Sequence, residues 1–330
     1  MKATTTALSK SLLAWYKENH RDLPWRQDRN PYRIWISEVM LQQTTVAAVI
    51  PYYERFLTRF PTVESLAEAP LEAVYEMWAG LGYYSRARNL HKSAQALAAT
   101  GFPKTATELL ELPGFGPYTS RAVASLAFDE AVGVLDGNVI RVLTRVYGWQ
   151  VEWWTQKAKP QLQTAADEIA SLGPSHLLNQ GLMELGATVC TPQNPTCLLC
   201  PWKSNCVAFR EGLTQALPLK KPRKQSEVWV WVPEIYRKGE QVALIKNNYA
   251  PFLKGQMIFP GTIRQQNQKP KTFDLKHGIT HHDIYIRIEN LTKSPIKSKA
   301  KELEWVRIKD IKKINPSNLL QKVLQQVLSS

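Results

Sequence analysis

The sequence predicts two domains, an all-α N-terminal domain followed by a small α+β domain. Residues 1–217 place apolar side chains at helical spacing, in segments punctuated by proline and glycine. Beyond residue 217, segments of alternating β-branched and aromatic residues are typical of strands. With 330 residues, of which 44% are apolar, the chain is long enough for two hydrophobic cores.

The N-terminal helices follow from caps and periodicity. One begins with Asn30 as a cap and Pro31 at its first position, and several end at glycine. No segment before residue 217 has the alternation of a strand. The expected helices span residues 1–20, 30–40, 46–60, 70–82, 85–101, 105–112, 117–128, 139–147 and 159–173.

The composition changes at "LPLKKPRKQ", where prolines and basic residues indicate an exposed linker at residues 218–227. The C-terminal domain, residues 228–330, has the usual size of one core. Its expected strands lie at 227–237, 241–247 and 282–290, followed by a short strand within 303–314 and a closing helix at 315–328.

Positive charge is concentrated in the last third of the chain. Residues 1–219 hold 20 Lys and Arg against 19 Asp and Glu, a net of +1, whereas residues 220–330 hold 22 against 9, a net of +13. A basic surface of this size favours a polyanion, most often nucleic acid. The alternative is a solvated lysine-rich face, formed by Lys293, Lys297, Lys299 and Lys301.

No stretch of eighteen apolar residues occurs, so no membrane span is expected. The apolar run in the first twenty residues is too short and interrupted for a secretory signal. We therefore expect a cytoplasmic protein, associated with the nucleoid in a bacterium.

All four cysteines lie in the segment "CTPQNPTCLLCPWKSNC", with spacing C-x6-C-x2-C-x5-C. Two disulfides within such a short intracellular segment are improbable. Four thiolates bind either zinc or an iron–sulfur cluster, and the spacing alone does not separate the two. The cysteines predict a metal centre.

Asp136 interrupts the apolar stretch "VGVLDGNVIRVL". A buried, unpaired carboxylate costs several kcal/mol, so the side chain needs a partner or a task. One interpretation is a helix N-cap. The other is a charged group that the protein uses.

A second motif, "LLELPGFGPYTSRAV", predicts a helix ending at Leu112, a turn, and a new helix opened by Pro117. Gly114 and Gly116 let the backbone approach a ligand, and a helix N-terminus favours an anion such as a DNA phosphate. The alternative is an ordinary helical hairpin with a glycine-rich corner.

In this order, the strings "LPGFGPYTSRAV", "LDGNVIRVL" and the cysteine run resemble the helix-hairpin-helix DNA glycosylase superfamily, with the hairpin at about 109–128. "LPWR", "SEVMLQQTTV", "GLGYYSRARNLHKSA" and "MELGATVC" resemble its adenine DNA glycosylase (MutY) family, over most of residues 20–206. The resemblance implies base excision repair of double-stranded DNA with adenine opposite 8-oxoguanine or guanine, by a monomer. It also implies a [4Fe–4S] cluster within residues 190–206, held by Cys190, Cys197, Cys200 and Cys206.

The resemblance assigns the chemistry to two carboxyls. Neutral Glu38 would protonate adenine, with its pKa raised by partial burial beside Trp35, Met40 and Leu41. Ionised Asp136 would stabilise the cationic sugar. Tyr118 would orient that site and Asn138 would assist it.

Further residues match the family's contacts with the extruded base and with DNA. Trp25, Arg26 and Glu184 match the adenine pocket, and Gln43 and Tyr83 match residues that fill the vacated base stack. Each has an alternative. Solvated glutamates are the alternative for Glu38 and Glu184, and packed aromatic side chains are the alternative for Trp25, Tyr83 and Tyr118. Arg26 could form a surface ion pair, and Asn138 could be an ordinary turn residue.

Two other functions stay open. An endonuclease III-like enzyme for oxidised pyrimidines would carry a nucleophilic lysine where this chain has Tyr118, and without that lysine the chain should be mainly a monofunctional glycosylase. A catalytically silent DNA-binding scaffold is disfavoured because Glu38, Asp136 and Tyr118 are all present.

The C-terminal domain resembles the family's Nudix-like domain through "LKGQMIFPGT", without the glutamate-rich box of a diphosphohydrolase. That domain reads 8-oxoguanine with a Phe-Ser-His loop, which here reads Ile279, Thr280 and His281. Thr280 keeps the hydroxyl, whereas Ile279 lacks the aromatic ring. Thr280 and His281 could equally be a strand-edge pair.

Overall fold

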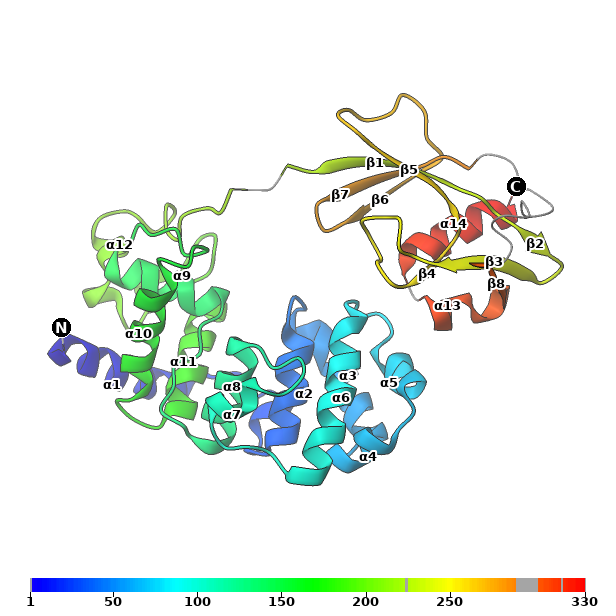
Figure 1. Ribbon diagram of the computed structural model, residues 1–330. Helices are drawn as coiled ribbons and strands as arrows, with labels where there is room; N and C mark the ends of the chain where they lie inside the picture. The colour runs from blue at the N-terminus through cyan, green and yellow to red at the C-terminus, as the bar shows by residue number, and fades with distance from the viewer. Residues whose placement is uncertain (1, 223–224, 289–301, 316, 330) are drawn as a thin grey trace. The chain divides into compact units, whose positions relative to one another are not determined.

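The computed structural model describes residues 2–222, 225–288, 302–315 and 317–329. It divides into two compact units, residues 1–221 and 222–330 (Figure 1). The division falls inside the segment predicted as a linker. The four lysines at 293, 297, 299 and 301, and the end of the predicted strand at 282–290, lie outside the described residues.

In the first unit, the described residues 2–221 form helices joined by loops, with no strand, as predicted. Its elements are α1 (Lys2–Asn19), η1 (Pro24–Arg26), α2 (Pro31–Leu41), α3 (Val46–Arg59), α4 (Val63–Glu68), α5 (Leu71–Trp78), α6 (Tyr84–Thr100), α7 (Ala106–Leu110), α8 (Pro117–Phe128), α9 (Gly137–Tyr147), α10 (Lys159–Ala170), α11 (Ser175–Thr188), η2 (Cys197–Leu199), η3 (Lys203–Asn205) and α12 (Val207–Arg210).

Several details differ from the sequence prediction. Helices α4, α11 and the short α12 were not expected, and α7 ends at Leu110 rather than Leu112. Helix α11 buries residues on several sides, including Asn179 and Glu184, and therefore lacks a one-sided apolar pattern.

Two hydrophobic cores fill this unit. One surrounds α2 to α8 and includes Trp35 and Trp78, and the other surrounds α9 to α12 with part of α1 and includes Trp202. Met183 of α11 packs against both cores. The chain's catalytic candidates lie along this boundary, as the site below shows.

Asn179 of α11 ties down the chain that leads to Asp136. Its Oδ1 accepts the Val134 N–H at 2.8 Å, and its Nδ2 donates to the Val132 carbonyl at 2.8 Å and to the Ser125 hydroxyl at 2.7 Å. The residue is fully buried, so these bonds replace water for the 132–134 backbone.

The second unit holds two four-stranded sheets. One has the order β5 (Gly261–Gln266), β1 (Glu227–Pro233), β7 (His282–Ile286), β6 (Leu275–Ile279), with β1 and β7 parallel and the other pairs antiparallel. The other joins β2 (Arg237–Lys238), β3 (Gln241–Lys246), β4 (Met257–Ile258) and β8 (Glu304–Arg307). The remaining elements are η5 (Ile308–Asp310), α13 (Ile311–Ile314) and α14 (Asn318–Ser329).

The predicted strands β1, β3, β7 and β8 and the closing helix α14 are confirmed, although β1 ends at Pro233 rather than at residue 237. β5 and β6 were not expected, because their side chains are mostly half-buried or exposed and give little apolar signal. Trp231, Phe259 and Leu320 lie in this unit's core. None of the helices in the described ranges is both long and apolar enough to cross a membrane.

Asn179→Ala should lower the free energy of unfolding by about 3 kcal/mol, because it leaves the buried Val134 N–H and Val132 carbonyl without the hydrogen bonds that Asn179 makes to them. Urea unfolding of the two proteins measures the difference. Asn19→Ala is the matched control, since Asn19 also donates to a backbone carbonyl but is exposed. The control should change stability by less than about 0.5 kcal/mol. An equally small loss at Asn179 would contradict its anchoring role.

Candidate active site

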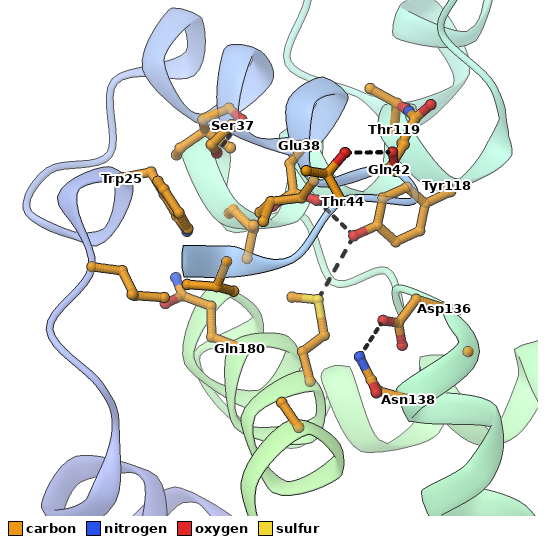
Figure 2. Close-up of a pocket in the computed structure, with 18 of the residues that line it drawn as sticks. Trp25, Ser37, Glu38, Gln42, Thr44, Tyr118, Thr119, Asp136, Asn138 and Gln180 are labelled. Carbon is orange, nitrogen blue, oxygen red and sulfur yellow. Dashed lines mark hydrogen bonds between the residues drawn. The ribbon is translucent and has the colours of Figure 1, made fainter. Parts of the chain in front are cut away.

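One cleft of the helical unit, about 720 Å³ in volume, collects side chains from η1, α2, α8, α9 and α11 (Figure 2). Met183 lines it, so the cleft lies where the two cores meet. Ten of the predicted site residues line the cleft: Trp25, Arg26, Glu38, Gln43, Gly114, Gly116, Tyr118, Asp136, Asn138 and Glu184.

Glu38 is buried on α2, with 4% of its surface exposed, so the alternative of a solvated helix residue is wrong. The Tyr118 hydroxyl donates to Glu38 Oε2 at 2.6 Å (Figure 2). Burial raises the pKa of Glu38 to about 7, against the opposing effect of the Tyr118 hydrogen bond and with a further contribution from the charge of Asp136. The carboxyl can therefore hold a proton near neutral pH.

Of the three apolar residues predicted beside Glu38, Leu41 lines the cleft with it, and Trp35 and Met40 are buried in the core around α2. The Trp35 ring stacks on Phe115, with centroids 5.3 Å apart. Burial keeps water from the carboxyl.

Asp136 is the N-cap of α9 and also lines the cleft, so both interpretations of this residue hold geometrically. Its Oδ1 accepts the Val139 N–H at 2.7 Å, and its Oδ2 accepts the Asn138 amide at 2.9 Å. Burial raises the pKa of Asp136, while these two hydrogen bonds and the charge of Arg141 act to lower it. The donors thus favour the ionised form inside a desolvated site.

Asn138 is oriented from both sides. While its amide donates to Asp136, its Oδ1 accepts Arg141 Nη2 at 2.7 Å. A Cβ at Gly186 of α11 would lie 2.6 Å from the Asn138 Cβ, so only glycine lets the two helices approach here. Asn138 therefore positions Asp136 and is more than a turn residue.

Glu184 is buried and saturated with donors. Its two oxygens accept Arg21 Nε at 2.6 Å, Arg21 Nη2 at 2.9 Å, the Arg21 backbone N–H at 3.2 Å and Arg26 Nη2 at 2.8 Å. Burial acts to raise the pKa of Glu184, but the arginines outweigh it and the pKa is lowered. The exposed alternatives for Glu184 and Arg26 are wrong, and the carboxylate is committed to orienting the two arginines.

Arg21 and Gln180 are among the polar cleft residues that were not found from the sequence. Gln180 Oε1 accepts the Tyr16 hydroxyl at 2.5 Å. Gln180 lies on α11, the helix whose pattern was missed. Trp25, by contrast, fits both of its interpretations, since it is buried edge-to-face on Tyr53 and still lines the cleft.

The two glycines of the hairpin turn are required for different structural reasons. Gly114 has a φ of 79° and lies against Asn89, whose Cβ would be 2.6 Å from an added Cβ. Gly116 has nothing within 4 Å of an added Cβ and is the N-cap of α8. The space at Gly116 and the unpaired N–H groups of the following helical turn suit the approach of an anion.

Gln43 and Tyr83 are both exposed and both have positive φ, 60° and 49°. Tyr83 is 53% exposed, so core packing is wrong for this residue. Arg86, which sequence reasoning missed, joins the two turns by donating to the Gln42 carbonyl at 2.6 Å and the Leu81 carbonyl at 3.2 Å. Its guanidinium lies 5.2 Å from the Tyr83 ring centroid.

The four cysteines are free thiols that line one small pocket. Four cysteines that line one pocket can ligate a metal centre together. Arg145 adds a donor, 3.3 Å from Cys190 Sγ.

Comparisons with known proteins agree with this geometry. A family model described as the HhH-GPD superfamily base excision DNA repair protein matches residues 36–169. An adenine DNA glycosylase of Buchnera aphidicola subsp. Schizaphis graminum is 33% identical over 98% of this chain and 99% of its own length. The chain belongs to the adenine DNA glycosylase family.

Other family members are longer. The adenine DNA glycosylase of Rattus norvegicus is 46% identical over 66% of this chain, but the match spans only 45% of the rat protein. Among solved structures, a thermostable thymine-DNA glycosylase matches 64% of this chain and 100% of its own, with a TM-score of 0.58 and 28% identity. This match agrees with a helical glycosylase fold.

The remaining predicted residues, Thr280 and His281, belong to the second unit. They form the two-residue turn between β6 and β7, where Ile279 pairs with His282. Thr280 has a φ of 56°, unusual for a β-branched residue.

Glu38→Gln should stabilise this family member above pH 7 and have little effect below pH 4.5. The pKa of Glu38 is about 7 in the folded protein and 4.5 ordinarily, so the folded state binds the proton more tightly. The contribution of neutral Glu38 to the free energy of unfolding is therefore complete below pH 4.5 and is lost as the pH rises to about 7. Above pH 7 the free energy of unfolding of the variant should exceed that of the wild type by about 3 kcal/mol. Urea unfolding from pH 4.5 to 8 measures it, with exposed Glu54→Gln as control. A pH-independent difference would show that Glu38 is not buried as a neutral acid.

Proposed function

We propose that the protein is a monofunctional adenine DNA glycosylase that excises adenine opposite 8-oxoguanine or guanine in double-stranded DNA. The observation that carries the proposal is the pair of carboxyls in one cleft, a buried Glu38 with a raised pKa and a hydrogen-bonded Asp136. Family membership and the hairpin at the cleft's rim support DNA as the substrate.

Glu38 would act as the general acid. Adenine leaves poorly as an anion, and a proton delivered to N7 lets it leave as a neutral base when the bond between N9 and the sugar carbon breaks. Tyr118 occupies Oε2, which leaves Oε1 to carry the proton. Because Tyr118 donates, it also fixes the direction of the carboxyl.

Asp136 would act on the sugar. As the base leaves with the bonding electrons, positive charge develops on the sugar ring, and a fixed carboxylate in a desolvated site stabilises that charge strongly. Water then adds to the sugar carbon and gives a proton to Glu38, which the protonation of adenine has left ionised, so the acid is restored. The N–H of Val139 and the amide of Asn138 hold Asp136 in place for this role.

The absence of an amine nucleophile supports a monofunctional enzyme. None of the residues that line the described cleft is a lysine. Burial raises the pKa of Tyr118 well above 10, so the phenol stays protonated and is not a nucleophile. Strand cleavage through a Schiff base is therefore not expected from this cleft.

Single-turnover excision assays on duplexes with A:8-oxoguanine and A:G test the proposal. The wild type should release adenine from both duplexes, and Glu38→Gln and Asp136→Asn should each lower the rate constant by at least about 100-fold. Glu54→Gln should retain full activity. The absence of abasic product at any enzyme concentration would reject the activity.

Borohydride reduction during the reaction tests the endonuclease III-like alternative, because it traps a Schiff base between a lysine and the DNA as a crosslink. Little protein–DNA crosslink is expected. Strong trapping that disappears when one lysine is replaced would show that the enzyme uses an amine nucleophile.

We propose that the cysteine pocket holds a [4Fe–4S] cluster ligated by Cys190, Cys197, Cys200 and Cys206. Burial raises the pKa of Cys200 to about 12, so its thiolate needs a compensating cation. A bound cluster supplies that charge and cross-links η2, η3 and the end of α11.

Anaerobically purified protein should be brown, with broad visible absorbance and about four iron atoms per chain. Absorbance and elemental analysis measure the iron. A Cys197→Ala variant should lose iron and absorbance together. A colourless protein with stoichiometric zinc at this segment would contradict the proposed cluster.

The C-terminal unit, we propose, is a Nudix-like domain that reads the base opposite adenine. Its positive charge favours DNA, and the exposed Thr280 hydroxyl at the β6–β7 turn suits a polar contact. Removing residues 222–330 should therefore reduce the preference for 8-oxoguanine over guanine more than it reduces adenine excision itself. The ratio of single-turnover rates on the two duplexes measures this. An unchanged ratio of the two rates would contradict the proposal that this unit recognises the base opposite adenine.

A further inference from the structure

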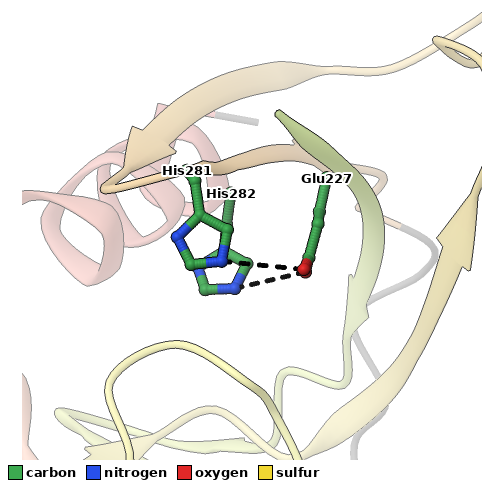
Figure 3. Close-up of side chains that lie close together, drawn as sticks. All are labelled: Glu227, His281 and His282. Atoms are coloured by element: carbon green, nitrogen blue, oxygen red, sulfur yellow. Dashed lines mark ion pairs between the residues drawn. The ribbon is translucent and has the colours of Figure 1, made fainter. Parts of the chain in front are cut away.

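A second cluster of reactive side chains lies in the C-terminal unit, at the start of strands β1 and β7. Glu227 opens β1 and is the register partner of His282, which opens β7. The Glu227 N–H donates to the His281 carbonyl at 2.8 Å, so the turn and the strand are joined through the backbone. Figure 3 shows both imidazoles directed at the Glu227 carboxylate.

We propose that Glu227, His281 and His282 bind a zinc ion. His282 Nε2 is 3.4 Å from one carboxylate oxygen and His281 Nε2 is 3.6 Å from the other. Tetrahedral zinc with bonds of about 2.1 Å places its ligand atoms about 3.4 Å apart. Direct hydrogen bonds would be shorter, about 2.7–3.2 Å. One ligand atom from each of the three side chains lies within 4.8 Å of the other two, close enough for all three to bind one ion.

The ligand types select the metal. Two neutral imidazoles and one carboxylate are a zinc donor set that leaves a fourth position for water or another ligand. Magnesium and calcium are disfavoured because they prefer oxygen ligands, whereas imidazole suits zinc and its neighbours in the transition series. Each side chain is half-buried, so an ion can enter and still be partly desolvated.

Outer contacts surround the three ligands. The Trp229 indole N–H donates to Glu227 Oε2 at 2.9 Å. The Thr280 hydroxyl donates to the Ile279 carbonyl at 2.6 Å, and its oxygen lies 3.4 Å from Nδ1 of each histidine, slightly beyond a normal hydrogen bond. Such outer contacts are typical of metal-ligating histidines, whose second nitrogen needs a partner.

The positive φ of Thr280 brings this hydroxyl to the two rings. The adjacent imidazoles lie with centroids 4.2 Å apart and planes at 35°. The His282 side chain is only 11% exposed, which limits its rotation. The zinc site would therefore hold the β6–β7 turn in one conformation, and it would occupy the His281 nitrogen otherwise available to DNA. The proposal does not depend on the glycosylase activity.

The test uses the full chain with its iron retained. Protein is equilibrated with zinc chloride, passed through a desalting column and analysed for zinc and iron. The wild type should keep about one zinc per chain with unchanged iron, which excludes replacement at the cysteines. Glu227→Gln and His282→Ala should lose this zinc. The control is His277→Ala, a half-buried histidine of β6 outside the cluster, which should keep it.

Trp229→Phe provides a graded readout, because it removes only an outer contact. Competition with a zinc indicator should show affinity reduced by about 10- to 100-fold. Glu227→Gln keeps an acceptor for the indole, so its result stands even if His282→Ala unfolds. Zinc retained equally by Glu227→Gln, or a wild type that keeps no zinc, would overturn the proposal.

Discussion

The fold of the helical unit places two carboxyl groups where its two hydrophobic cores meet, and this desolvation controls the site. In water both groups would be ionised at neutral pH. Inside the cleft, burial raises both pKa values, and the local donors then separate the two groups. Glu38 has one phenolic donor, whereas Asp136 has a backbone N–H and an amide. The proposed roles use this difference in donors, with the proton on Glu38 and the charge on Asp136.

The supporting contacts explain why the catalytic candidates come from separate helices. Asn179 fixes the segment before Asp136, Gly186 lets α11 approach Asn138, and Met183 packs against both cores. Glu184 orients Arg21 and Arg26 rather than offering free oxygens to the cleft. Helix α11 thus supports the site mostly through residues that position others.

The sequence predicted the helical domain, the change of composition at the linker and ten of the residues that line the cleft, because these depend on local signals. Caps, hairpin glycines and the cysteine spacing are each contained in a few residues. It did not predict α11, whose several-sided burial removes the amphipathic period. It also missed Arg21 and Arg86, because an arginine that binds distant carbonyls or carboxylates resembles a surface arginine in sequence. For Asp136 the two alternatives were not exclusive, since capping and facing the cleft use the same carboxylate.

The left-handed backbone at Gln43 and Tyr83 has a thermodynamic consequence. A non-glycine residue in this conformation costs about 1 kcal/mol, which glycine would avoid. The protein keeps a long side chain at positions 43 and 83, and Arg86 joins the two turns through hydrogen bonds to their backbone carbonyls. The helical unit is therefore less stable than its topology permits, and the deficit is located at the two projecting side chains rather than in the interior.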